Sequence, residues 1–280
     1  MREINVKDIE ESVRNLCIEA NYYVGDDIKQ ALQNAKEKEP YKIAEDVLDK
    51  IILNDEIAAK EQMPMCQDTG MACAFLEIGQ DVHISGGLLE DAINEGVRRG
   101  YQDGFLRKSV VKDPIDRVNT KDNTPAVIYY DIVAGDKIKI TLAPKGFGSE
   151  NMSRIGMLKP ADGLEGVKEF IIETVRLAGP NPCPPMVVGV GIGGTFDKAA
   201  YLAKKALLRP VNTSNSQEFY KDLEIELLEK INELGIGPQG FGGKTTALGL
   251  NIETYPTHIA GLPVAVNINC HATRHKEAIL

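Results

Sequence analysis

The sequence predicts an α+β fold, with one compact domain over residues 1–280 and a helical lobe at its N-terminus. Two observations support this class. Apolar residues recur at helical spacing through the first 60 residues, and runs of β-branched residues alternate with further helical patterns after that. No internal repeat, low-complexity tract or linker divides the chain, and 280 residues suffice for one large domain.

The N-terminal lobe is predicted to contain three helices. Asp26 is the expected N-cap of the second. The apolar stripes of the first and third are Ile9, Val13, Leu16 and Ala20, and Ile43, Val47, Ile51 and Ile52. The turn-forming stretch MPMCQDTG (63–70) then breaks the helical pattern. Chemistry is more common in such a loop than on the helices around it.

Strands and helices alternate through the rest of the chain. Two β-branched runs, TPAVIYYDIVAGD (124–136) and KIKITLAP (137–144), suggest a hairpin turning at Gly135-Asp136. A glycine-rich loop, KGFGSEN (145–151), follows them. The other expected strands are 71–79, 81–85, 186–194, 248–252 and 263–268, and the other expected helices are 88–101, 164–178, 198–208 and 217–234.

Charge and composition exclude several classes of protein. With 41 acidic and 32 basic side chains the net charge is −9, which argues against binding nucleic acid or an anionic membrane surface. No run approaches the roughly 20 apolar residues of a membrane span. The first residues, MREINVKDIEES, have no apolar signal segment, and the five cysteines are an odd number. We therefore expect a cytoplasmic protein with reduced thiols.

Two glycine-rich motifs resemble nucleotide-binding loops. Gly189–Gly194 matches GxGxxG after an apolar run, but no second strand ending in an acidic residue follows about 20 residues later. Tight packing of a helix on a strand, or a seat for a substrate carboxylate, are the alternatives. Gly243-Lys244-Thr245 imitates a phosphate loop, but Pro238 stands where that motif requires its first glycine.

The five cysteines divide into two groups. Cys17 and Cys73 lie in apolar helical and strand patterns, as core residues do. Cys66, Cys183 and Cys270 lie in the loops MCQDTG, NPCPP and INCHATRH, without the CxxC pair of a structural zinc site. If these three thiolates converge, they suit a soft metal centre with one open position, such as a four-iron cluster that acts as a Lewis acid.

Polar residues near these loops are candidates for substrate chemistry. Asp68 lies two residues from Cys66, and His258 is an acid–base candidate, although an isolated histidine is more often structural. Arg107 could hold a carboxylate, and so could Lys145 or Arg154, with surface solvation as the default for each.

Six motifs in this order resemble the class I, iron–sulfur-dependent fumarate hydratase family, specifically its α subunit or N-terminal domain. The related L-tartrate dehydratase α subunit shares the CQDTG and CPP loops but lacks the GSEN signature, so the resemblance favours fumarate. The motifs are MCQDTG, NTPAVIYYDIV, KGFGSENMSRIGMLKP, GPNPCPPMVVGVGIGGT, LGIGPQGFGGKTTALG and NINCHATRH.

The resemblance implies a role for particular residues. Cys66, Cys183 and Cys270 match the ligands of a [4Fe-4S] cluster, while Cys17 and Cys73 match none. The catalytic pair would be Asp68 and His258. The substrate-binding residues would be Gln67, Arg107, Gly146 and Gly148.

The resemblance also implies a partner and a reaction. The family's catalytic base lies in a β part that follows the last cysteine motif, and this sequence ends ten residues after Cys270. We therefore expect a separate β subunit, an α2β2 heterotetramer and interconversion of (S)-malate and fumarate. A tartrate dehydratase, a nucleotide-dependent enzyme using Gly189–Gly194 and a non-catalytic iron–sulfur subunit stay open as alternatives.

Overall fold

A computed structural model of the chain describes residues 2–280 and contains two units, each with its own sheet and core. Unit 1 consists of the segments up to Gly25, Asn54–Phe147 and Arg274–Leu280. Unit 2 consists of Asp26–Leu53 and Gly148–Thr273. The mixed sheets and helices confirm the predicted α+β class. Within residues 2–280, no helix combines the length and apolarity that crossing a membrane requires.

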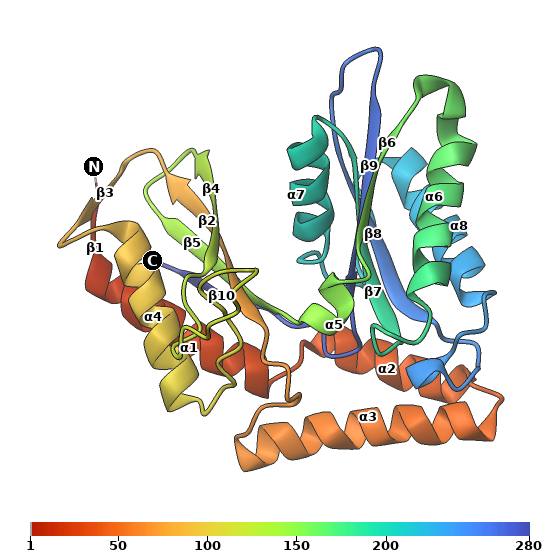
Figure 1. Cartoon of the computed structure of the whole chain (residues 1–280), viewed down its shortest axis with the longest axis horizontal. Helices are drawn as coiled ribbons and strands as arrows, with labels where there is room; N and C mark the ends of the chain where they lie inside the picture. Colours follow the sequence, from red (N-terminus) through yellow and green to blue (C-terminus); the bar gives the residue numbers. More distant parts are fainter. Residues whose placement is uncertain (1) are drawn as a thin grey trace. The chain divides into compact units, whose positions relative to one another are not determined.

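The four-stranded sheet of unit 1 is covered on one face by two helices (Figure 1). Its strand order is β10 (Lys276–Ile279), β5 (Ile138–Lys145), β2 (Met71–Gly79) and β4 (Val127–Val133). The covering helices are α1 (Val6–Tyr22) and α4 (Leu89–Asp103). Separately, β1 (Arg2–Asn5) and β3 (Val82–Ser85) form a two-stranded parallel ribbon.

The predicted hairpin between residues 124 and 144 is wrong. Both strands exist, but β2 lies between them, antiparallel to β5 and parallel to β4. Most of β2 is buried, so it gains hydrogen bonds and packing partners on both sides by taking this central place. Phe75 of β2 stacks on Tyr129 of β4, with ring centroids 4.8 Å apart.

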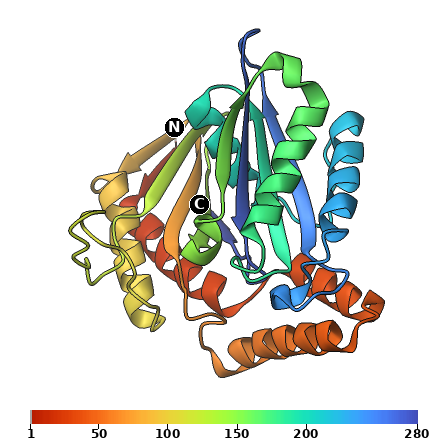
Figure 2. The ribbon, with the colours of Figure 1, turned by 45° about the vertical axis from the view of Figure 1, so that its right-hand side comes forward.

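Unit 2 has three layers (Figure 2). Its sheet has the order β6 (Arg154–Leu158), β9 (Leu262–Asn269), β7 (Met186–Gly193) and β8 (Ala247–Tyr255). Helix α7 (Phe196–Ala206) covers one face, and α6 (Gly163–Ala178) and α8 (Glu218–Asn232) cover the other. The remaining elements are α2 (Asp26–Lys38), α3 (Lys42–Glu61), α5 (Phe147–Glu150), η1 (Pro160–Asp162) and η2 (Pro238–Gly240).

The three N-terminal helices form as predicted, with two differences: Asp26 is the first residue of α2 and not its N-cap, and the buried face of α3 is shifted. The buried face of α3 carries Ala44, Leu48, Ile51 and Ala58, whereas Ile43 is 64% exposed. Ile51 is buried as expected, and Val47 and Ile52 are partly buried, so the observed face overlaps the expected stripe and is shifted toward Ala44 and Leu48. Several adjacent apolar residues in KIAEDVLDKII fit either face, so spacing alone does not select one.

The glycines of β7 serve close packing against α7. A Cβ on Gly189 would lie 2.2 Å from the Ala203 carbonyl oxygen, and one on Gly191 would lie 2.1 Å from that of Ala199. Real Cβ atoms do not approach so closely. The packing explanation therefore accounts for the first two glycines of the GxGxxG match without a nucleotide.

Candidate functional site

In unit 1, Cys66 lies in the loop between α3 and β2. Its thiol is partly exposed and accepts a hydrogen bond from the Asp68 N–H at 3.4 Å. The same sulfur donates to the Gln67 Oε1 at 3.6 Å. The loop thus places a thiol, a carboxamide and a carboxylate together over three successive residues.

The Asp68 carboxylate is held at both oxygens by backbone N–H groups. Gly70 donates to Oδ1 at 3.0 Å, and Phe147 donates to Oδ2 at 2.8 Å. A Cβ on Gly146 would come within 3.2 Å of Oδ2, so this glycine leaves the carboxylate open on that side. The structure therefore brings together Gln67, Asp68 and Gly146, three of the predicted site residues.

A third contact fixes the backbone of the same residue. The buried Arg274 guanidinium donates from Nη2 to the Asp68 carbonyl oxygen at 2.6 Å. Arg274 follows the last cysteine motif in the sequence, yet it belongs to unit 1. Asp68 and Arg274 are 206 positions apart, so local sequence patterns do not predict their contact.

Buried side chains support the carbonyls that follow Asp68. The Tyr101 hydroxyl donates to the carbonyl oxygens of Thr69 and Gly70, at 2.6 and 3.0 Å. Burial raises the pKa of Tyr101 well above its ordinary value, so the hydroxyl stays a donor. Asn123 Nδ2 also donates to the Gly70 carbonyl, at 3.1 Å. Sequence reasoning missed both supporting side chains.

Arg107 lies on an exposed loop segment tied to the Cys66 loop. Its carbonyl oxygen accepts a hydrogen bond from the Thr69 hydroxyl at 3.1 Å. On the same loop, Asn123 Oδ1 accepts from the Ser109 N–H at 2.7 Å. The backbone of Arg107 is thereby anchored while its side chain is exposed. That arrangement suits a residue that reaches toward a carboxylate.

In unit 2, Cys183 and Cys270 lie at the same edge of the sheet. Cys183 precedes β7, Cys270 follows β9, and these strands are antiparallel with Val187 opposite Asn269. The His271 N–H donates to the Cys183 carbonyl oxygen at 3.2 Å and joins the two loops. Cys183 is exposed, and Cys270 is partly exposed.

His258 lies at the opposite edge of that sheet. It follows β8, which runs parallel to β7, so it stands beyond the C-terminal end of β7. The eight residues of β7 separate the two edges by roughly 25 Å. The side chain is exposed, and Nδ1 accepts from the Ala260 N–H at 3.1 Å. The structure does not bring His258 to Cys183 and Cys270 of its own chain.

The GSEN stretch is fixed in unit 2 through its glutamate. Glu150 accepts hydrogen bonds from Lys204 Nζ and Asn267 Nδ2, both at 2.6 Å. Gly148 beside it is exposed, and a Cβ there would meet nothing closer than 4.0 Å. Of the other basic candidates, Arg154 lies over the Phe170 ring at 5.3 Å and Lys145 is buried.

The exposure of the three loop cysteines is compatible with binding an iron–sulfur cluster, whereas the other two cysteines are buried. None of the five forms a disulfide. Cys17 and Cys73 are buried in α1 and β2, and burial raises the pKa of the Cys17 thiol. The three loop thiols are at least partly exposed, as thiolate ligands must be before they bind metal. Within residues 2–280, no three His, Cys, Asp or Glu side chains gather closely enough to hold a metal ion.

Comparisons with known proteins cover nearly the whole chain. The model of the family described as Fumarate hydratase (Fumerase) matches residues 10–279. A Methanocaldococcus jannaschii protein, provisionally named L(+)-tartrate dehydratase subunit alpha, is 46% identical over 95% of both chains. The L(+)-tartrate dehydratase subunit alpha of Escherichia coli K12 is 32% identical over 96% of this chain and 89% of its own length. The same values apply to that of Shigella sonnei.

Proposed function

The chain belongs to the fumarate hydratase family of hydro-lyases, and we propose that it is the α subunit of an enzyme that interconverts (S)-malate and fumarate. The observation that carries the proposal is the carboxylate of Asp68, which lies on the loop of Cys66 and is held by the N–H groups of Gly70 and Phe147. Dehydration of a 2-hydroxy acid needs an acid–base group beside a site that polarises the departing hydroxyl.

Cys66, Cys183 and Cys270 are the proposed ligands of a [4Fe-4S] cluster. Their partial exposure and the link between the Cys183 and Cys270 loops support this choice. When bound, such a cluster supplies a Lewis acid that polarises a hydroxyl group without a change of redox state.

The other residues of the Cys66 loop have proposed roles in binding and proton transfer. Asp68 holds the proton that accompanies the departing hydroxide, while Gln67 and Arg107 bind the substrate carboxylates. Gly146 and Gly148 present backbone to the substrate where a larger side chain would intrude. The two N–H contacts to Asp68 support this assignment because they fix the direction of its carboxylate.

His258 keeps a proposed acid–base role on one condition. Its place at the far edge of the unit 2 sheet separates it from Cys183 and Cys270 of the same chain. We infer that His258 acts at the cysteine centre of another α chain. An assembly of several α chains, such as the expected α2β2 heterotetramer, provides that possibility.

A separate β subunit is part of the proposal. The relatives are named subunit alpha, and this chain spans 95% and 89% of the lengths of two of them. We infer that the base that removes the substrate's C–H proton comes from such a partner.

L(+)-tartrate is the second candidate substrate, favoured by the names of the relatives. It is also a 2-hydroxydicarboxylic acid, so the same acid–base and carboxylate-binding groups apply. The GSEN stretch favours malate, because it belongs to the resemblance to class I fumarate hydratases and not to that with the tartrate dehydratase α subunit.

The test is turnover by the chain co-expressed with a β partner and purified without oxygen. We expect kcat/KM for (S)-malate and fumarate to exceed that for L(+)-tartrate. The reverse order would replace the first substrate by the second. A bound cluster with no turnover of any of the three would make this a non-catalytic iron–sulfur subunit.

A further inference from the structure

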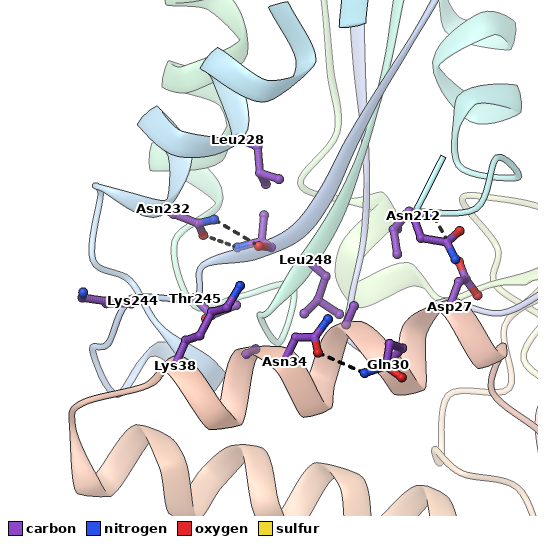
Figure 3. A pocket seen from close by; sticks show the side chains of 14 residues that line it. Asp27, Gln30, Asn34, Lys38, Asn212, Leu228, Asn232, Lys244, Thr245 and Leu248 are labelled. Carbon is purple, nitrogen blue, oxygen red and sulfur yellow. Dashed lines mark hydrogen bonds between the residues drawn. The ribbon is translucent and has the colours of Figure 1, made fainter. Parts of the chain in front are cut away.

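Unit 2 contains a cavity of about 720 Å³, lined by both apolar and polar side chains, that the proposed reaction does not use. It lies between α2, α8 and the loop before β8 (Figure 3). The side chains that carry the argument are Gln30, Asn34, Lys38, Asn232, Lys244 and Thr245. This volume is in the range of small-molecule sites.

Two lysines in the lining, Lys38 and Lys244, differ from other lysines of this region in their ionic contacts. Other lysines of the same helix are paired, Lys29 with Asp26 at 3.4 Å and Lys36 with Asp49 at 2.5 Å. Within residues 2–280, neither Lys38 nor Lys244 makes a salt bridge. Figure 3 shows the Lys38 side chain extending from the C-terminal end of α2 toward Thr245.

The loop that carries Lys244 is anchored before any ligand arrives. The Lys244 N–H donates to the buried Glu39 carboxylate at 2.8 Å. Gly243 has φ +127, and a Cβ there would lie 2.8 Å from that of Ala44, so only glycine fits against the start of α3. Lys244 is thus held opposite α2 by contacts of its backbone.

Carboxamides complete the lining. Asn232 Oδ1 accepts hydrogen bonds from the N–H groups of Thr246 and Ala247, at 2.8 and 2.9 Å, and so fixes the start of β8. Gln30 Nε2 donates to Asn34 Oδ1 at 3.0 Å, so this pair is oriented along α2. Asn232 is engaged by these contacts and by its own donation to the Ala247 carbonyl, whereas the Gln30–Asn34 pair leaves a carboxamide oxygen and N–H groups for a ligand.

The charge of the lining indicates an anionic ligand. The chain carries a net charge of −9, yet this cavity has two ammonium groups and one carboxylate. That carboxylate, Asp27, accepts a hydrogen bond from the Val211 N–H at 3.0 Å. An adjoining cavity of about 600 Å³ shares Lys244 and contains Glu229 and Glu233. The lining of the larger cavity is therefore the more positive of the two.

We propose that this cavity binds a small organic oxyanion, with its carboxylate or phosphate group between Lys38 and Lys244. Gln30, Asn34 and Thr245 hydrogen-bond the rest of the molecule. The GKT stretch thus contributes its lysine to an anion site without forming a phosphate loop, because Pro238 lies where that loop needs glycine.

The test is calorimetric titration of the full chain at constant ionic strength with two probes, inorganic phosphate and succinate. Saturable binding of either probe is expected, and the better one identifies the anionic group. Lys38→Gln and Lys244→Gln should each weaken binding about tenfold, because each removes one charged hydrogen-bond donor.

Lys29→Gln is the matched control, since Lys29 lies on the same helix, is paired with Asp26 and does not line the cavity. It should bind the probe as the unmodified chain does. All three lysines are at the surface, so each variant should keep its circular dichroism spectrum. Equal affinities of all variants, or no binding of either probe at millimolar concentration, would overturn the proposal.

Discussion

Asp68 is the residue whose contacts most directly support the proposed acid–base chemistry, because two N–H groups hold its carboxylate. Asp68→Asn keeps the side chain's shape but removes the charge and one acceptor oxygen. Loss of a positioned acid–base group should lower kcat about 10²–10⁴-fold with little change in KM. Steady-state kinetics on (S)-malate with the β partner present measures this. Asp116→Asn, on an exposed loop, is the control, and equal kcat in the two variants would remove Asp68 from the mechanism.

The Tyr101 hydroxyl supports the Asp68 loop through two buried hydrogen bonds, so removal of this hydroxyl should lower the stability of the protein. Tyr101→Phe removes the buried donor of the Thr69 carbonyl and leaves the Gly70 carbonyl with Asn123 alone, so the free energy of unfolding should fall by about 1–3 kcal/mol. Denaturant unfolding measures the change. Tyr41, which is 61% exposed, provides the control substitution Tyr41→Phe. An unchanged midpoint in Tyr101→Phe would mean that these hydrogen bonds contribute nothing net.

Sequence reasoning finds the reactive residues more readily than the residues that hold them. Cysteines in turn-rich loops and an aspartate two positions away are local signals. Tyr101 and Asn123 reach the Gly70 carbonyl from 31 and 53 positions away, and nothing in their own neighbourhoods marks them. Support of this kind depends on tertiary packing, which no local pattern records.

At the scale of elements, local patterns predict where strands form but not how the strands pair. Periodicity locates β4 and β5 correctly, but pairing is decided by where the most buried strand goes. Because β2 is apolar along most of its length, it takes the place between them that a hairpin would have closed. The short edge strands β1, β6 and β10 carry little pattern and were not predicted.

The close approach of β7 and α7 makes a sharp prediction. Gly191→Ala would put a Cβ 2.1 Å from the Ala199 carbonyl, so it should destabilise the chain by about 2–3 kcal/mol or more. Gly261→Ala is the control, because a Cβ there has only ordinary contacts at 3.8 Å and beyond. Chemical unfolding of the two variants checks this. Similar stability in both would show that the strand and helix separate freely.

The loop that carries Asn123 is fastened to α4 through Asp122, with a consequence for pH. Desolvation raises the pKa of the Asp122 carboxyl, but hydrogen bonds from Thr124 and Arg98 outweigh it and lower the pKa to about 2. A carboxyl group whose pKa is lowered on folding stabilises the folded protein at pH values above its pKa in the unfolded chain, which is 3.8 for Asp122. That stability is lost as the pH falls toward 2.

Asp122→Asn should therefore remove part of the acid sensitivity. Between pH 6 and pH 3, the unmodified chain should lose about 1 kcal/mol more unfolding free energy than the variant. Urea unfolding at the two pH values gives the difference. Parallel losses in both proteins would show that Asp122 has the same pKa folded and unfolded.

For the whole molecule, the α+β class follows from periodicity and the family from ordered motifs, whereas the division into two units follows from neither. Three cysteines that a sequence pattern groups together belong to different units, Cys66 to unit 1 and the other two to unit 2. If the three are cluster ligands, as proposed, the binding free energy of the cluster adds to the free energy of folding, because the unfolded chain presents no such set of ligands.

The central claim is therefore tested most directly by iron content after anaerobic reconstitution with iron and sulfide. The unmodified chain should bind about four iron atoms with broad visible absorbance. Cys66→Ser, Cys183→Ser and Cys270→Ser should each lose most of both, while Cys73→Ala, altered in the buried strand β2, should keep them. Undiminished iron in Cys183→Ser, or equal loss in Cys73→Ala, would contradict the assignment of the three loop cysteines as cluster ligands.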